Sequence, residues 1–219
     1  MKKLVIVGGG GFAREVLWLI EEINKAAPDG TLTYEVLGFI SRDSEVLVQG
    51  VPVLGNDKWA FANLERNVRF VLAIGDSALR AQLALAYQKN GFHPLRLIHP
   101  SVVMSDEVEM GGGTIVCAGS VLTVNIQIGM FCIVNLNATI GHDCRIGDFV
   151  TLNPGVHLSG GSDIGDMSTL GTGAIVLPGM KVGDRSILGA GAVVTENLPG
   201  GATYIGVPAK ETPAHHVPS

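Results

Sequence analysis

The chain has 219 residues, which is enough for one large domain or two modest ones, each with its own hydrophobic core. Hydrophobic residues make up 47% of it, charged residues 16% and aromatic residues only 5%, while 30 residues are glycine, a composition that favours short, closely stacked turns. The formal net charge is −5 and the 15 basic residues are scattered, which argues against binding of nucleic acid and favours small molecules or further copies of the chain as partners.

The first residues do not read as a targeting segment. The apolar run that begins at Leu4 stops at four glycines, and Arg14 and Glu15 follow, so no signal-peptide core is present. No stretch approaches the roughly 18 apolar residues of a membrane span. The three cysteines, at positions 117, 132 and 144, show no metal-ligand spacing. We therefore expect a cytoplasmic protein with reduced cysteines and no membrane segment.

Residues 1–92 predict a small α/β domain with a Rossmann-like parallel sheet. Strands are expected at 4–7, 34–40 and 68–74, and helices at 12–26 and 77–90, the second of them capped by Ser77. Strands that alternate with helices imply parallel pairing. Residues 93–219 then form a second domain of different character.

A glycine-rich turn follows the first strand. Gly8, Gly10 and Ala13 fit the pattern G-x-G-x-x-A, in which backbone N–H groups reach a phosphate at a helix N-terminus. A dinucleotide domain normally ends its second strand on an acidic residue, whereas Ile40 is followed by Ser41, and the domain is short for a full six-stranded dinucleotide sheet. NAD binding, a purely structural turn and binding of another nucleotide's phosphates remain open, and we favour the last.

The second half carries an unbroken six-residue repeat. Every sixth residue from Ile98 to Val194 is Ile, Leu, Val or Met. The next residue is often Gly, where a turn needs either a positive φ or a bare backbone, and the residue four after the aliphatic is usually small. A period of six fits neither a helix nor a simple strand. It predicts a prism with three flat faces, each one hexad wide, in which the aliphatic column fills the interior.

Together the two halves resemble one family, the hexapeptide-repeat acyltransferases, and within it the nucleotide-sugar N-acetyltransferases and sialic acid O-acetyltransferase-like proteins of bacterial surface-glycan pathways. The matching segments are 8–15, 71–76 with Arg80, 141–148, 187–194 and 206–210. The resemblance implies a left-handed parallel β-helix over about residues 98–210 in which residues 18 apart stack. Many relatives have His where this chain has Phe12 and Thr151.

Acetyl transfer needs a general base and donors for the tetrahedral oxyanion. Only two histidines, His142 and His157, lie well inside the repeat, and His142 follows a turn glycine at an outward position beside Asp143. From the residues alone, this pair is equally consistent with a solvated surface pair. The resemblance implies that His142 is the base and Asp143 its helper. We interpret His157 as a surface ring and the cysteines of the repeat as core residues.

We also predict the residues that bind the acceptor. They are Gly9, Gly10, Gly11, Phe12, Ser41, Arg42, Gly75, Asp76, Arg80 and, as the resemblance implies, Asn135. Asn135 has a second interpretation, because Asn135 and Asn153 replace a turn glycine and Asn tolerates the left-handed conformation.

The donor site follows from the resemblance. It implies that acetyl-CoA lies in the groove between neighbouring β-helices, which requires a homotrimer with shared active sites. We expect no metal. The predicted contacts are Gly160, Gly161, Gly173, Ala190, Gly191, Gly206, Pro208 and Lys210, the last of which meets a CoA phosphate.

The sequence thus predicts transfer of acetyl from acetyl-CoA to the amino group of a nucleotide-linked 4-amino-4,6-dideoxy sugar. The nearest alternative is a sugar O-acetyltransferase that acts on sialic acid or a related sugar. A γ-class carbonic anhydrase needs three histidines on zinc, and only two lie well inside the repeat. A non-catalytic solenoid is disfavoured by the Gly141-His142-Asp143 turn and the nucleotide-like front domain.

Overall fold

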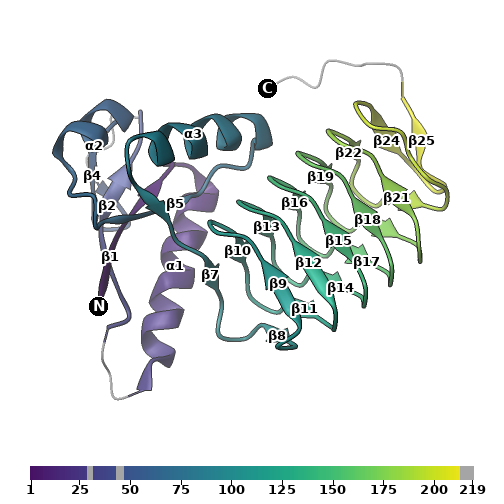
Figure 1. The fold of residues 1–219 in the computed structure, drawn as a ribbon, viewed down its shortest axis with the longest axis horizontal. Coiled ribbons are helices and arrows are strands. Elements are labelled where there is room, and N and C mark those ends of the chain that lie inside the picture. Colours follow the sequence, from purple (N-terminus) through teal and green to yellow (C-terminus); the bar gives the residue numbers. More distant parts are fainter. Residues whose placement is uncertain (29–31, 43–46, 213–219) are drawn as a thin grey trace. The chain divides into compact units, whose positions relative to one another are not determined.

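The computed structural model describes residues 1–28, 32–42 and 47–212 (Figure 1). It divides the chain into two compact units, Met1–Pro100 and Ser101–Ser219. Residues 93–100 are grouped with the first unit, whereas the sequence predicts a boundary at residues 92 and 93. None of the helices in the described ranges is long and apolar enough to cross a membrane.

The first unit is built on a mostly parallel sheet in the order β3-β4-β2-β1-β5-β6. The strands are β1 (Lys2–Val7), β2 (Tyr34–Ile40), β3 (Leu47–Val48), β4 (Val51–Gly55), β5 (Arg69–Leu72), β6 (His93–Pro94) and, outside this sheet, β7 (Leu97–Ile98). Only β3 pairs antiparallel. The expected parallel sheet is confirmed. It does reach six strands, because the short strands β3 and β6 complete its edges.

Within the described residues, three helices accompany this sheet: α1 (Gly11–Ala26), α2 (Asp57–Asn63) and α3 (Ser77–Lys89). The buried residues of α1 include Ala13, Val16, Leu17 and Ile20, whose spacing forms the apolar stripe expected of a helix that packs on a sheet. The cap of α3 is Asp76, whose carboxylate accepts the Leu79 N–H at 2.9 Å, so the predicted Ser77 cap is wrong by one residue.

The second unit is a stack of coils whose short strands, parallel except for β25, form three sheets (Figure 1). The first sheet holds β10 (Ile115–Val116), β13 (Ile133–Val134), β16 (Thr151–Leu152), β19 (Thr169–Leu170), β22 (Ile187–Leu188), β24 (Thr203–Ile205) and β25 (Lys210–Glu211). The second holds β8 (Val103–Met104), β11 (Val121–Leu122), β14 (Thr139–Ile140), β17 (His157–Leu158), β20 (Ile175–Val176) and β23 (Val193–Val194). The third holds β9 (Val108–Met110), β12 (Ile126–Ile128), β15 (Arg145–Ile146), β18 (Asp163–Ile164) and β21 (Lys181–Val182).

Strand register confirms the predicted coil. Thr139 pairs with Val121 on one side and with His157 on the other, so neighbouring coils are offset by three hexads. The second residue of nearly every strand, such as Leu122 or Ile140, is buried in the interior of the prism. The left-handed parallel β-helix expected from the family resemblance is therefore confirmed.

The turn glycines and the left-handed residues occupy different positions of the hexad. The glycine directly after the aliphatic needs a bare backbone: a Cβ on Gly141 would lie 2.7 Å from the Gly160 nitrogen. Positive φ occurs two residues later, for example 61° at Asp143 and 71° at Gly161. Asn135 shows no positive φ in the described part of the chain, so the interpretation of this residue as a left-handed turn cap is wrong.

Where the small position of a hexad is Ser, Thr or Cys, its side chain donates to a backbone carbonyl. The Ser120 hydroxyl donates to the Asn135 carbonyl at 2.9 Å, and the Cys144 thiol donates to the Ser159 carbonyl at 3.2 Å, each 15 residues ahead. Buried hydroxyls and thiols therefore have partners and do not cost stability. All three cysteines are buried and none forms a disulfide, which confirms their interpretation as core residues.

Candidate functional site

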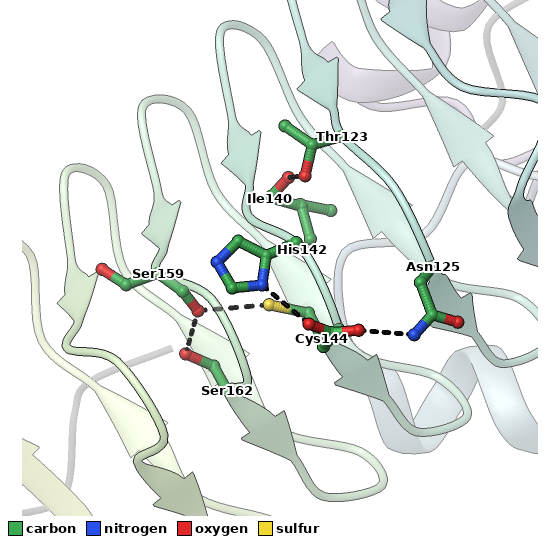
Figure 2. Close-up of polar contacts among 8 residues, drawn as sticks. Thr123, Asn125, Ile140, His142, Cys144, Ser159 and Ser162 are labelled. Carbon is green, nitrogen blue, oxygen red and sulfur yellow. Dashed lines mark hydrogen bonds and ion pairs between the residues drawn. The ribbon is translucent and has the colours of Figure 1, made fainter.

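The turn between β14 and β15 carries the predicted catalytic pair. His142 and Asp143 are exposed, with 66% and 55% of their side-chain surface accessible. His142 Nδ1 lies 2.7 Å from Asp143 Oδ2 (Figure 2). The structure therefore joins the two predicted catalytic residues directly, on an outward-facing corner between the second and third sheets.

The Asp143 carboxylate sets the tautomer of the imidazole. The hydrogen bond with His142, and then the one from Asn125, lowers the pKa of Asp143 below its usual value. An ionised carboxylate only accepts hydrogen bonds, so Nδ1 of His142 carries the proton. The lone pair of the neutral ring is then on Nε2, which is the atom available to accept a proton.

The next coil passes directly beside the imidazole. A Cβ on Gly160 would lie 2.5 Å from both Cε1 and Nε2 of His142, so only glycine leaves room for the ring in this position. The Gly161 N–H donates to the His142 carbonyl at 2.8 Å. Gly160 and Gly161 are thus the two predicted donor-site residues that the structure brings to the catalytic pair.

The remaining predicted donor-site residues lie elsewhere on the coil. Gly173, Ala190 and Gly191 are in turns between the first and second sheets. Gly206, Pro208 and Lys210 belong to the β24–β25 hairpin or its turn, where the Lys210 ammonium pairs with the Glu196 carboxylate. Glu196 continues the column of His142 and Gly160 down the same corner, because β20 and β23 pair with an 18-residue offset.

The first unit contains a cavity of about 190 Å³ where β1 and β2 end. It is lined by Val7, Gly8, Gly9, Ile40, Ser41, Arg42, Asp57, Ile74, Leu79 and Leu83. Gly8 has φ 126°, and a Cβ there would lie 2.7 Å from the Ala73 carbonyl oxygen, so the turn requires glycine. The carboxyl ends of parallel strands are where open α/β sheets bind ligands. Three predicted acceptor residues, Gly9, Ser41 and Arg42, line this cavity.

Other predicted acceptor residues lie nearby, and several of them begin or cap helices. Gly10 is the N-cap of α1, Gly11 begins the helix, and Phe12 is half-buried. Gly75 is exposed, and the Asp76 carboxylate caps α3.

Arg80 and Asn135 are placed differently from these residues. Arg80 is only 1% exposed, and its Nη1 donates to the carbonyls of Ile74 at 2.7 Å and Gly75 at 3.0 Å, so it holds the loop after β5. Asn135 lies in the second unit, where its Oδ1 accepts the Leu136 N–H at 2.7 Å.

Two polar residues of these sites escaped the sequence analysis. Asp57 lines the cavity, accepts the Tyr87 hydroxyl at 3.1 Å and lies 3.9 Å from the Arg42 guanidinium. Burial raises the pKa of Tyr87, so its hydroxyl stays protonated as a donor. The other is Asn125, which contacts Asp143 from the preceding coil. The sequence does contain a signal for Asn125, because it lies 18 residues, or one coil, before Asp143.

His157 lies apart from the catalytic pair, on the second sheet. Its Nδ1 lies 2.8 Å from the Thr139 hydroxyl, and the ring is exposed, as a surface histidine would be. No group of three or more His, Cys, Asp or Glu residues in the described ranges is arranged to hold a metal ion.

The comparisons with known proteins agree with this geometry. Residues 3–86 match the family model described as the PglD N-terminal domain. No match was found among curated proteins. Among solved structures, perosamine N-acetyltransferase from Caulobacter crescentus is 36% identical, with 98% of each chain covered and a TM-score of 0.88. The acetyltransferase domain of PglB from Neisseria gonorrhoeae is 33% identical over 97% of this chain and 100% of that chain, with a TM-score of 0.89.

A third solved structure, WeeI from Acinetobacter baumannii, is 30% identical over 97% of this chain and 100% of that chain, with a TM-score of 0.86. The coil, the front α/β unit and the exposed His–Asp pair define a hexapeptide-repeat acyltransferase. Within that class, the chain belongs to the family of sugar N-acetyltransferases that includes the perosamine enzyme.

Proposed function

We propose that the protein transfers the acetyl group of acetyl-CoA to the amino group of a nucleotide-linked 4-amino-4,6-dideoxy sugar, for synthesis of a surface polysaccharide or glycan. The observation that carries the proposal is the His142–Asp143 pair, whose imidazole lies over Gly160. Two similar proteins support it: the perosamine enzyme was solved with CoA and GDP-perosamine, and the PglB domain with acetyl coenzyme A.

The chemistry follows from the tautomer of His142. The sugar amine attacks the thioester carbonyl, and Nε2 of His142 accepts the proton that the nitrogen loses. The Asp143 carboxylate, 2.7 Å from Nδ1, stabilises the resulting imidazolium. The C–S bond then breaks, and the imidazolium returns its proton to the departing sulfur of CoA.

The developing oxyanion needs a donor beside the base. The Gly160 N–H has no acceptor among the described residues, and this residue lies directly under the imidazole. A backbone N–H is fixed before the reaction begins and costs no reorganisation. We therefore assign the Gly160 N–H to the oxyanion of the tetrahedral intermediate.

The donor site extends down the corner from His142. Glu196 lies three coils further on and holds the ammonium of Lys210. Coils stack about 4.8 Å apart, so this distance is about 14 Å. An extended CoA that places its thioester at His142 has its phosphates at that end of the corner, where Lys210 supplies positive charge.

The outward residues of the sheets support the proposed homotrimer. At its outward positions the second sheet presents Val103, Val121, Ile175 and Val193, with Thr139 and His157 between the two pairs, and Val103 is 65% exposed. The third sheet presents charged and amide side chains at its equivalent positions: Glu109, Gln127, Arg145, Asp163 and Lys181. An exposed apolar face of this kind marks an interface, and we assign it to two further copies.

A three-fold arrangement also explains why the predicted donor residues lie on two corners. The second sheet is bordered by the His142 corner on one side and by the corner of Gly173, Ala190 and Gly191 on the other. When three such sheets face a common axis, the His142 corner of one copy meets the opposite corner of its neighbour. Each donor groove then takes residues from two copies.

The acceptor's nucleotide is assigned to the cavity of the first unit. The turn Gly8–Gly11 and the start of α1 offer backbone N–H groups to the diphosphate. Ile40, Ile74 and Leu79 give the cavity apolar walls for a base, and Asp57 offers a carboxylate to its N–H groups.

The decisive experiment is a substrate panel. The protein is incubated with acetyl-CoA and with UDP-, dTDP- or GDP-linked 4-amino-4,6-dideoxy sugars, and release of the CoA thiol is followed. We expect turnover with at least one nucleotide amino sugar and none with free sialic acid. Turnover confined to a sugar hydroxyl would contradict N-acetylation and identify an O-acetyltransferase.

Replacement of the base tests the mechanism. His142→Ala should lower kcat by roughly 10²–10⁴-fold, the usual contribution of a positioned general base. Binding of acetyl-CoA and of the acceptor should persist, because the side chain is exposed. In the perosamine enzyme, variants with one histidine replaced by asparagine or alanine were likewise solved with CoA and GDP-perosamine. His157→Ala is the control and should cost far less. Near-normal activity of His142→Ala at neutral pH would exclude this base.

A further inference from the structure

The carboxylate of Asp143 has a second partner on the preceding coil. Asn125 lies in the turn between β11 and β12, and its side-chain amide donates to Oδ1 of Asp143, 18 residues ahead (Figure 2). The other oxygen, Oδ2, holds His142. Asn125 and Asp143 occupy the same place in successive turns, and both have left-handed backbone, with φ 55° and 61°.

We infer that Asn125 is a positioning residue for the base and acts through Asp143; the inference rests on the proposed role of His142. Asn125, Asp143 and His142 form a chain of side chains that crosses from one coil to the next. Of these three side chains, only that of His142 has a proposed contact with the substrate.

The physical need for Asn125 comes from the exposure of the pair. Asp143 lies on a turn with 55% of its side chain accessible, so its rotamer is not fixed by packing. A carboxylate that is free to rotate holds the imidazole only part of the time. Because Asn125 fixes one oxygen, the other stays directed at Nδ1 of His142.

The ionisation of Asp143 also supports a positioning role for Asn125. After the bond with His142, the hydrogen bond from Asn125 is the next cause of the lowered pKa of Asp143. A donor that stabilises the ionised carboxylate also keeps the proton on Nδ1 of His142, and so leaves Nε2 free to act as the base.

The position of the His142 ring therefore depends on residues of both adjacent coils. Asn125 on the preceding coil holds the carboxylate, and Gly160 on the following coil leaves space for the ring. Only a fold that stacks equivalent turns brings these three positions together.

The first test removes the amide without straining the backbone. Asn125→Gly tolerates φ 55°, which Ala does not, so the variant should fold and form the same coil. We expect kcat to fall by about tenfold, the typical effect of a lost hydrogen bond to a charged group, with the KM for acetyl-CoA unchanged. The matched control is Arg185→Gly, which has φ 55° on the exposed corner between the third and first sheets, outside the proposed donor groove, and should keep full activity. Full activity of Asn125→Gly would overturn the inference.

A double-mutant cycle tests whether Asn125 acts through Asp143. In an Asp143→Gly background, Asn125→Gly should have almost no further effect, because the residue through which it acts is absent. An equal loss in both backgrounds would show that Asn125 acts by another route and would overturn the inference.

Asn125→Asp tests whether position 125 is electrostatically coupled to the base. It keeps the size of the side chain but places a second carboxylate beside Asp143. The added negative charge favours the imidazolium, so the acid limb of kcat/KM should move to higher pH. An NMR titration of the His142 ring should move in the same direction. This NMR readout does not depend on turnover, so it tests Asn125 even if His142→Ala proves active. An unchanged titration in both Asn125 variants would overturn the inference.

Discussion

Gly160 shows how a missing side chain can matter for a residue on another coil. Its backbone does not need glycine, since it lacks the positive φ of Gly161. Its Cβ position is instead occupied by the ring of His142, at 2.5 Å. The ring is the exposed end of a flexible side chain, so a methyl group there would displace the ring and leave the coil intact.

Gly160→Ala should therefore separate activity from stability. We expect the thermal unfolding midpoint to remain near that of the wild type and kcat to fall by about tenfold or more, because a general base must lie within hydrogen-bond reach of the proton it takes. The Gly160 N–H is retained in this variant, so the loss reports on the position of His142. Unchanged turnover, measured beside acetyl-CoA affinity, would show that the ring does not act from this position.

At this scale the sequence predicts neighbours in the chain better than neighbours in space. His142 and Asp143 are adjacent, so their contact could be predicted, whereas Asn125 reaches Asp143 across 18 residues and Tyr87 reaches Asp57 across 30. The left-handed turn position was also missed. Phe131 and Asp143 occupy it as well as glycines, so composition does not reveal it.

At the scale of elements, the start of α1 is the feature most open to redesign. Gly10 caps the helix without a side-chain bond, has an ordinary φ of −79°, and a Cβ there would meet nothing within 4 Å. An Asp or Asn side chain therefore fits and can cap the helix.

Gly10→Asp should weaken binding of the nucleotide sugar while α1 remains folded. The new carboxylate caps the helix but repels the diphosphate, so we expect the KM for the acceptor to rise by about tenfold or more. Gly10→Asn is the control, because it supplies the cap without the charge. Acetyl-CoA affinity, measured by calorimetry, should be unchanged in both. Loss of both ligands together would place the diphosphate elsewhere.

The longer elements were predictable because their hydrophobic residues are periodic and glycine, proline or capping residues mark their ends. The observed ranges of β1, β2, α1 and α3 are close to the expected ones. Each aliphatic residue of the hexad repeat is the last residue of a short strand. Helix α2 and the β3–β4 hairpin were missed, since they span only two to seven residues and lack a full period.

At the scale of the whole molecule, the apolar residues at both ends of the second sheet's outward row, Val103 and Val121 and then Ile175 and Val193, predict the assembly. Light scattering should show a trimer at micromolar concentration. Ile175→Asp should dissociate it, because a carboxylate would be buried against two other copies. Gln127→Asp on the third sheet is the matched control and should leave the trimer intact. A monomeric wild-type protein would exclude the shared donor groove.

The ion pair between Glu196 and Lys210 has a further consequence for the donor. Because it lies on the same column as His142, the distance between the base and the lysine is fixed by the number of coils that separate them. Along the solenoid axis, the separation of two residues of this column is therefore a multiple of about 4.8 Å. An insertion shorter than one complete coil would move side chains to a different face. The length of the proposed donor site can therefore change only in whole coils.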